Sequence, residues 1–211
     1  MCTSLIHNGN KTIVGWNLDI LDMEHKVVSE DNAVYIAVND KSEGWLPLFG
    51  ANGRGEFVAM PTCWPYDGRS DPQNDGSINI INLDIDLLLR KKTFSEVKNI
   101  AESGIVCSIP GTTFQAQLTD KNGNVLQIVP GQGTRYIERP KYSVMTNFSP
   151  FKGDSEKHPW MGFDRYRTAD RMLTNADEDF IVLIILLVIE AHQDKVLNDI
   201  ALRENKENDN L

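Results

Sequence analysis

Two Asn-Gly pairs constrain the fold of this chain more than any other feature of its sequence. Asn8-Gly9 separates the apolar runs TSLIH and TIVGWNLDI, and Asn122-Gly123 separates FQAQLTD and VLQIV. Asn-Gly between two apolar runs is the strongest short-range signal for a β-hairpin. The sequence therefore predicts two antiparallel hairpins. Further strands are expected at AVYIAV, GEFVAM, GIVCSI, TRYIE and YSVMTN, which is enough for two sheets.

Three segments have the pattern of helices. The first carries apolar residues at helical spacing, namely Ile78, Ile81, Ile85, Leu88 and Leu89. The second begins with the capping box formed by Thr93 and Glu96 and stops at Gly104. The third is GFDRYRTADRMLT, with an apolar stripe along one side. Strands followed by helices, twice over, predict an α+β sandwich in which helices cover antiparallel sheets.

The composition excludes several classes of protein. The chain has 211 residues, enough for one domain, and its net charge of −9 argues against binding to nucleic acid. The three cysteines and four histidines lack the spacing of a disulfide framework or a metal site, so no cofactor is expected. The apolar run 180–189 has ten residues, too few for a membrane span of about 20. No secretory signal is visible, which predicts a cytoplasmic protein.

Cys2 directly follows the initiator methionine and opens the first predicted strand. Removal of the methionine would give this one residue both a thiol and a free α-amine. An α-amine, with a pKa of about 7.7 to 8.0, is well matched to accept the proton of a thiol whose pKa is about 8.5. One residue would then supply the nucleophile and its base. The alternative is that Cys2 is a small apolar residue of the strand, as free cysteines usually are.

The motifs that accompany Cys2 favour the nucleophile. The series MCTS, VGWNLDI, TDKNGNVLQIV, YSVMTNFSPF and DRYRTADRML, within residues 2 to 175, resembles the choloylglycine hydrolase and penicillin V acylase family. These are N-terminal nucleophile hydrolases with a cysteine nucleophile, related to acid ceramidase and acyl-CoA:6-aminopenicillanic acid acyltransferase. The resemblance implies a four-layer αββα sandwich formed by one domain, 1–175. The segment 176–211 matches nothing, and we expect it to complete the domain and end in a disordered tail.

The resemblance also implies roles for four side chains. Cys2 matches the nucleophile, and Asp19 matches the aspartate that orients the α-amine. Asn147 matches the asparagine whose amide donates to the oxyanion, and Arg165 matches an arginine at the start of a helix in the site. Each has a simpler alternative: a strand end for Asp19 and Asn147, and a solvated helix face for Arg165. The motif before the aspartate usually contains arginine, whereas this chain has Trp16.

Two functions remain open on the sequence alone. The first is hydrolysis of a linear, non-peptide amide through a thioester on Cys2, with Trp16 lining the substrate pocket. The second is a relative that has lost activity, through Trp16 or the short C-terminus, and acts as a binding or assembly module. The expected partner is a small-molecule amide. A sheet that lacks its last strands leaves an unpaired edge, which favours a homo-oligomer.

Overall fold

The computed structural model describes residues 2–18, 23–30, 32–41, 44–64, 76–110, 112–151 and 162–176. Asp19 and almost all of the unmatched segment 176–211, including the apolar run 180–189, lie outside the described residues. The elements follow one another as β1 (Cys2–Asn8), β2 (Thr12–Leu18), β3 (His25–Glu30), β4 (Ala33–Asp40), β5 (Gly44–Asn52), β6 (Phe57–Ala59), β7 (Thr62–Cys63), β8 (Ile78–Asn79), α1 (Ile80–Leu88), α2 (Phe94–Glu102), β9 (Val106–Cys107), β10 (Thr113–Phe114), β11 (Ala116–Thr119), β12 (Val125–Val129), β13 (Gly133–Ile137), β14 (Tyr142–Met145) and α3 (Phe163–Thr174).

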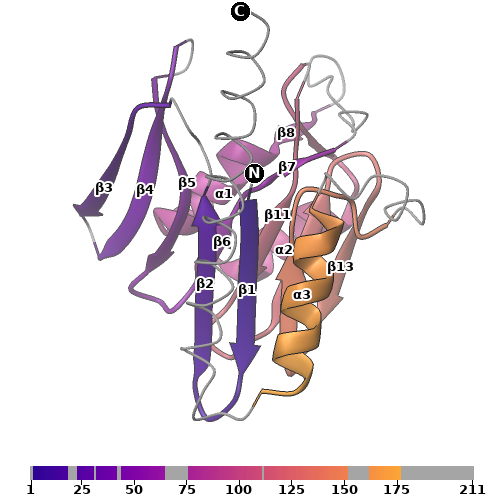
Figure 1. The fold of residues 1–211 in the computed structure, drawn as a ribbon. Helices are drawn as coiled ribbons and strands as arrows, with labels where there is room; N and C mark the ends of the chain where they lie inside the picture. The colour runs from indigo at the N-terminus through magenta and orange to yellow at the C-terminus, as the bar shows by residue number, and fades with distance from the viewer. Residues whose placement is uncertain are drawn as a thin grey trace, which may run out of the picture.

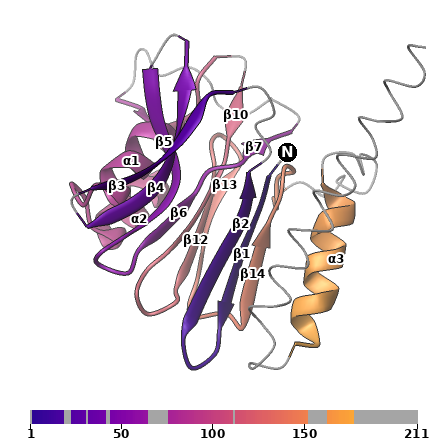
Figure 2. The ribbon, with the colours of Figure 1, turned by 60° about the vertical axis from the view of Figure 1, so that its left-hand side comes forward.

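Two sheets face each other and helices cover their outer sides. The larger sheet has the strand order β13-β12-β11-β6-β5-β4-β3, and the smaller one has the order β14-β1-β2. The helices α1 and α2 lie behind the larger sheet, and α3 lies in front of the smaller one (Figure 1). Figure 2 shows the four layers side by side. The predicted αββα sandwich is therefore confirmed.

Both hairpins predicted from Asn-Gly pairs are present. β1 pairs with β2 in antiparallel register from Cys2 opposite Leu18 to Asn8 opposite Thr12. β11 likewise pairs with β12. Gly123 has a positive φ of 81°, which a side chain would strain, and a Cβ there would lie 2.1 Å from the Asn8 side-chain oxygen. The two hairpin turns thus meet at a point where only glycine fits.

Three strands, β3, β5 and the two-residue β7, were missed, and two predicted boundaries were wrong. β3 is an edge strand with mostly exposed side chains, and β5 contains Pro47 at a register shift opposite β4, so neither shows the usual alternation. The predicted first helix starts later than expected, because Ile78 belongs to β8 and Asn79 caps α1. The predicted strand GIVCSI is reduced to Val106–Cys107, which pairs with β8 in parallel.

The core lies in two places. The main cluster of buried apolar side chains fills the space between the two sheets and under α1 and α2, with Phe49, Phe57 and Leu118 among its most buried members. A smaller cluster lies under α3 and is formed by Leu5, Val144, Ala169 and Leu173. Successive side chains of β1 therefore alternate between the space between the sheets and the space under α3. Among the described residues no helix is long and apolar enough to cross a membrane.

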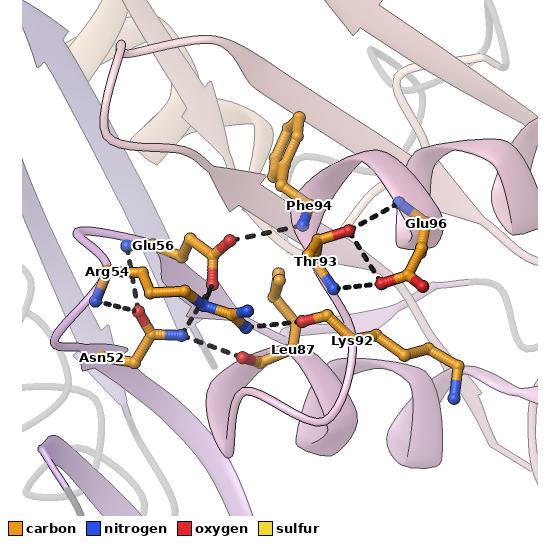
Figure 3. Close-up of polar contacts among 8 residues, drawn as sticks. All are labelled: Asn52, Arg54, Glu56, Leu87, Lys92, Thr93, Phe94 and Glu96. Atoms are coloured by element: carbon orange, nitrogen blue, oxygen red, sulfur yellow. Dashed lines mark hydrogen bonds and ion pairs between the residues drawn. The ribbon is translucent and has the colours of Figure 1, made fainter.

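A polar cluster at the β5–β6 turn attaches both rear helices to the larger sheet (Figure 3). The Asn52 amide donates to the Glu56 carboxylate at 2.8 Å and to the carbonyl oxygen of Leu87, at the end of α1, at 2.9 Å. The same carboxylate accepts the backbone N–H of Phe94, the first residue of α2. Glu56 is therefore a buried carboxylate that satisfies a free helix N–H. The predicted capping box of Thr93 and Glu96 is confirmed beside it.

Asp84 is a buried carboxyl group of a different kind. It lies on α1 and is completely inaccessible to solvent. Neither carboxyl oxygen has a hydrogen-bond partner in the described part of the chain. Burial raises the pKa of Asp84 well above its usual value, because a carboxylate is poorly solvated there. Burial therefore favours the neutral, protonated form of this side chain.

Candidate active site

Cys2 begins the central strand of the smaller sheet. β1 is bordered by β2 on one side and by β14 on the other, and Cys2 lies opposite Leu18. The side chain of Cys2 is 7% exposed and packs into the main core cluster between the sheets. Figure 2 places the start of β1 beside β7 and β10, away from the hairpin turn. The ladder with β2 thus includes Cys2 itself, and the ladder with β14 begins at Ser4.

Asn147 lies directly after β14 and contacts the main-chain nitrogen of Cys2. Its Oδ1 accepts a hydrogen bond from Cys2 N at 2.7 Å. Its Nδ2 donates to the carbonyl oxygen of Thr62 at 2.8 Å and to the Thr62 hydroxyl at 3.1 Å. The family resemblance implies that the Asn147 amide nitrogen donates to an oxyanion. In this structure it donates to Thr62 instead. In this geometry the buried Asn147 side chain orients the nitrogen of Cys2.

Arg165 joins the same cluster from the first turn of α3. Its Nη1 donates to the carbonyl oxygen of Cys2 and to the Thr3 hydroxyl, the latter at 2.8 Å, and its Nη2 donates to Asn147 Oδ1 at 2.9 Å. The side chain is 9% exposed, so the alternative of a solvated helix face is excluded. Asn147 Oδ1 consequently accepts two hydrogen bonds, one from Cys2 and one from Arg165.

Gly162 explains how α3 brings the arginine so close. The residue precedes the helix with a φ of 92°, a backbone conformation that favours glycine. A Cβ at this position would lie 2.3 Å from Arg165 Nη2. Its carbonyl oxygen accepts the Thr146 hydroxyl at 3.0 Å, which ties the start of α3 to the end of β14. The local sequence GFDR therefore sets the guanidinium against Asn147.

Thr62 is a member of the cluster that the sequence did not reveal. It lies in β7, within the stretch MPTCWPYDG. Besides the two bonds from the Asn147 amide, the adjacent Trp64 N–H donates to the Asn147 carbonyl oxygen at 2.7 Å. The segment thus holds both the side chain and the main chain of Asn147. Nothing local in the sequence signals this, because the two segments are 85 residues apart.

Trp16 packs in the space between the sheets. It lies opposite Ser4 in the β1–β2 pair, so its side chain shares a face with Cys2. Its ring centroid lies 5.4 Å from that of Phe57 and 6.4 Å from that of Phe49. The side chain is half-buried against the main core cluster. Trp16 is therefore part of an aromatic wall on the Cys2 side of the smaller sheet.

The structure brings together three of the four predicted catalytic residues: Cys2, Asn147 and Arg165. Asp19 follows the end of β2 and lies outside the described residues. All three cysteines are buried and form no disulfide in the described ranges, and no group of three or more metal-binding side chains is gathered there. The result is a cationic, hydrogen-bonded cluster around the nitrogen and carbonyl oxygen of a cysteine at the start of a strand.

The fold is that of the N-terminal nucleophile hydrolases. Conjugated bile acid hydrolase from Clostridium perfringens aligns with a TM-score of 0.51 at 15% identity, over 81% of this chain and 57% of that chain. An N-acylethanolamine-hydrolysing acid amidase ortholog from Caenorhabditis elegans aligns with a TM-score of 0.55 at 18% identity, over 89% of this chain and 85% of that chain. Penicillin V acylase from Agrobacterium tumefaciens aligns with a TM-score of 0.51 at 13% identity, over 90% of this chain and 71% of that chain.

These likenesses are of structure and not of sequence. No protein-family model matches the chain, and no curated protein matches it in sequence. The chain spans little more than half the length of the bile acid hydrolase that it resembles. At these identities the comparisons show the fold.

Proposed function

We propose that this protein is an amidohydrolase that cleaves linear, non-peptide amides, with Cys2 as its nucleophile after removal of Met1. The convergence of Cys2, Asn147 and Arg165 carries the proposal, because 145 residues separate the first two and 18 the last two. The fold adds support, since the solved structures that resemble it include an acid amidase and a penicillin acylase. The roles below follow from the contacts of each group.

The free α-amine acts as the base in this mechanism. It takes the proton of the Cys2 thiol as the sulfur attacks the amide carbonyl carbon. The C–N bond then breaks, and the ammonium returns the proton to the departing amine. This leaves an acyl group in a thioester with Cys2. A water molecule then attacks the thioester carbon and gives a proton to the α-amine. The C–S bond breaks, the ammonium passes that proton to the departing sulfur, and the carboxylic acid is released with the thiol and the neutral amine regenerated.

Asn147 and Arg165 prepare this amine for proton transfer. In the chain that still carries Met1, Asn147 Oδ1 accepts a hydrogen bond from the main-chain N–H of Cys2. After removal of Met1 the same contact would orient the α-amine. The Arg165 guanidinium contacts both Asn147 Oδ1 and the Cys2 carbonyl oxygen. A buried positive charge near the amine favours its neutral form, which is the form that can accept a proton. Asp19 would stabilise the ammonium that forms, and Trp16 would contribute an apolar wall for the acyl group.

The proposal is tested with N-acyl 4-nitroanilides of increasing acyl chain length, which release a coloured amine on cleavage. Intact-mass measurement first selects protein that begins at Cys2. We expect turnover by this protein, a covalent acyl adduct that maps to Cys2, and no turnover by Cys2→Ala. Cys63→Ser and Cys107→Ser serve as matched controls, and both should remain active. Adducts confined to Cys63 or Cys107 would contradict the proposal.

An inactive binding module is the competing function, and the same measurements separate the two. A processed protein that keeps its melting temperature and binds amides, yet forms no adduct at Cys2, would be such a module. The Asn147→Ala and Arg165→Met variants should each lower turnover by at least about 10²-fold if the cluster prepares the amine. A binding module would show no such dependence.

A further inference from the structure

A concave region lies beside β14, apart from the Cys2 cluster. Here β14 is the last strand of the smaller sheet, and it is followed by a hollow of about 350 Å³ between β13, β14 and α3. The hollow, called the β14 hollow below, is lined by Gln127, Arg135, Tyr142, Phe148, Phe163 and Tyr166 among others. Cys2, Asn147 and Arg165 are not part of its lining. The region is therefore distinct from the candidate active site.

The charged group of the β14 hollow is Arg135. Its Nε and Nη2 both donate to Gln127 Oε1, the former at 3.0 Å, and its guanidinium lies 5.6 Å from the ring centre of Phe151. Its acceptor is thus a neutral amide. Among the residues that the structure describes, no carboxylate forms an ion pair with it. Arginine carries five N–H donors in a rigid plane, so donors remain for a further partner.

Gln127 is fixed in the orientation that presents its oxygen to Arg135. The residue is 3% exposed, and its Nε2 donates to Gln117 Oε1 at 3.1 Å and to the Ser143 hydroxyl at 3.2 Å. Gln117 is itself held by the Ser4 hydroxyl at 2.9 Å. Rotation of the Gln127 amide would lose these bonds and place its N–H groups against the guanidinium. A buried network thus positions a cation that forms no ion pair with a carboxylate of the described residues.

Aromatic rings form another part of the lining. Phe148 contacts Tyr166 and Phe163 edge to face, with ring centres 5.3 Å and 5.5 Å apart. Tyr166 is half-buried, and its hydroxyl has no hydrogen-bond partner in the described ranges. Burial is the main cause that raises the pKa of Tyr166, with Asp170 adding to the effect, so the hydroxyl stays a neutral donor. Asp170 itself accepts the Tyr142 hydroxyl at 2.8 Å.

We propose that the β14 hollow binds a small aromatic monocarboxylate, with Arg135 and the Tyr166 hydroxyl on the carboxylate and the Phe148–Phe163 wall on the ring. A guanidinium matches the two oxygens of a carboxylate, and edge-to-face aromatic contacts suit a flat ring. The nearby Asp170 carboxylate opposes a second negative charge, which favours a monoanion. The site does not depend on the proposed hydrolase activity, because none of that cluster lines it.

The test uses 4-fluorobenzoate, followed by ¹⁹F NMR line broadening on titration with the full-length protein. Two further probes separate the contributions: 4-fluorobenzamide keeps the ring without the charge, and trifluoroacetate keeps the charge without the ring. We expect 4-fluorobenzoate to bind at least tenfold more tightly than either. Equal binding of all three probes would overturn the proposal.

Variants locate the site. Arg135→Gln should weaken 4-fluorobenzoate binding about tenfold, and Tyr166→Phe, which removes one hydroxyl, should weaken it several-fold. Arg171→Gln makes the same charge change at an exposed position of α3 outside the hollow and should leave binding unchanged. Cys2→Ala should also bind normally. Loss of binding in Cys2→Ala, or unchanged binding in both Arg135→Gln and Tyr166→Phe, would show that the carboxylate binds elsewhere.

Discussion

Replacing Asp84 by asparagine should stabilise the protein, and the gain should grow as the pH rises. The Asp84 carboxyl is fully buried without a hydrogen-bond partner among the described residues, and burial raises its pKa. A raised folded pKa means that the stability contribution is complete at low pH and is lost as the pH rises toward that value. Asparagine has nearly the same shape and carries no charge at any pH.

The size of the effect follows from proton linkage. In an unfolded chain Asp titrates near pH 3.9, so folding must return a proton to Asp84 at every higher pH. Each pH unit between that value and the folded pKa costs about 1.4 kcal/mol, and two units cost about 2.7 kcal/mol. For a chain of this length, 1 kcal/mol corresponds to about 2–4 °C in melting temperature. Two pH units should therefore widen the gap between variant and wild type by about 5–11 °C.

The assay is thermal unfolding, followed by circular dichroism in steps of half a pH unit from pH 4 to pH 8. Asp86→Asn is the matched control on the same helix, because Asp86 is partly exposed and pairs with Lys92 at 2.5 Å. Loss of such a pair should change stability by no more than about 1 kcal/mol. If the melting curves of wild type and Asp84→Asn stay parallel across the range, Asp84 is not held protonated and the reasoning is refuted.

Two further predictions concern the candidate site. Thr62→Val should lower the rate of Cys2 alkylation or turnover about threefold to tenfold, because it removes the hydroxyl that accepts a hydrogen bond from the Asn147 amide. Thr62→Ser keeps a hydroxyl and should restore the rate. Equal rates in the two variants would contradict a role for this hydroxyl in positioning Asn147. Trp16→Arg should lower the melting temperature by several degrees, because the guanidinium would lie against Phe49 and Phe57. Trp16→Phe should be tolerated. A Trp16→Arg protein with an unchanged melting temperature would show that the aromatic wall around Trp16 is open to solvent.

Local signals account for the parts of the fold that the sequence could predict. An Asn-Gly turn and a capping box act over fewer than ten residues, so the β1–β2 hairpin and the start of α2 were found correctly. β3 and β5 were missed because their stability comes from their neighbours in the sheet. An edge strand needs no apolar alternation, and Pro47 fits β5 only because the register shifts there.

The sequence predicted which residues form the candidate site, but it did not predict their hydrogen-bond partners. Resemblance to a known family singled out Cys2, Asn147 and Arg165, and the structure brings these three together. The partner of the Asn147 amide depends on how β7 lies beside the end of β14, which no local pattern encodes. The Gln117–Gln127 network was missed for the same reason, since polar residues inside a strand indicate a solvated face until the opposite sheet is known.

The central place of β1 has a consequence for the order in which the protein is made. Cys2 is synthesised 145 residues before its partner Asn147, and Arg165 follows later still. At about 5–20 residues per second, on the order of ten seconds or more separate the two ends of this contact on the ribosome. During that interval β1 can pair only with β2. The cysteine is therefore made early but gains the groups that orient it only when nearly the whole described chain has emerged, so an incomplete chain carries the thiol without its surrounding cluster.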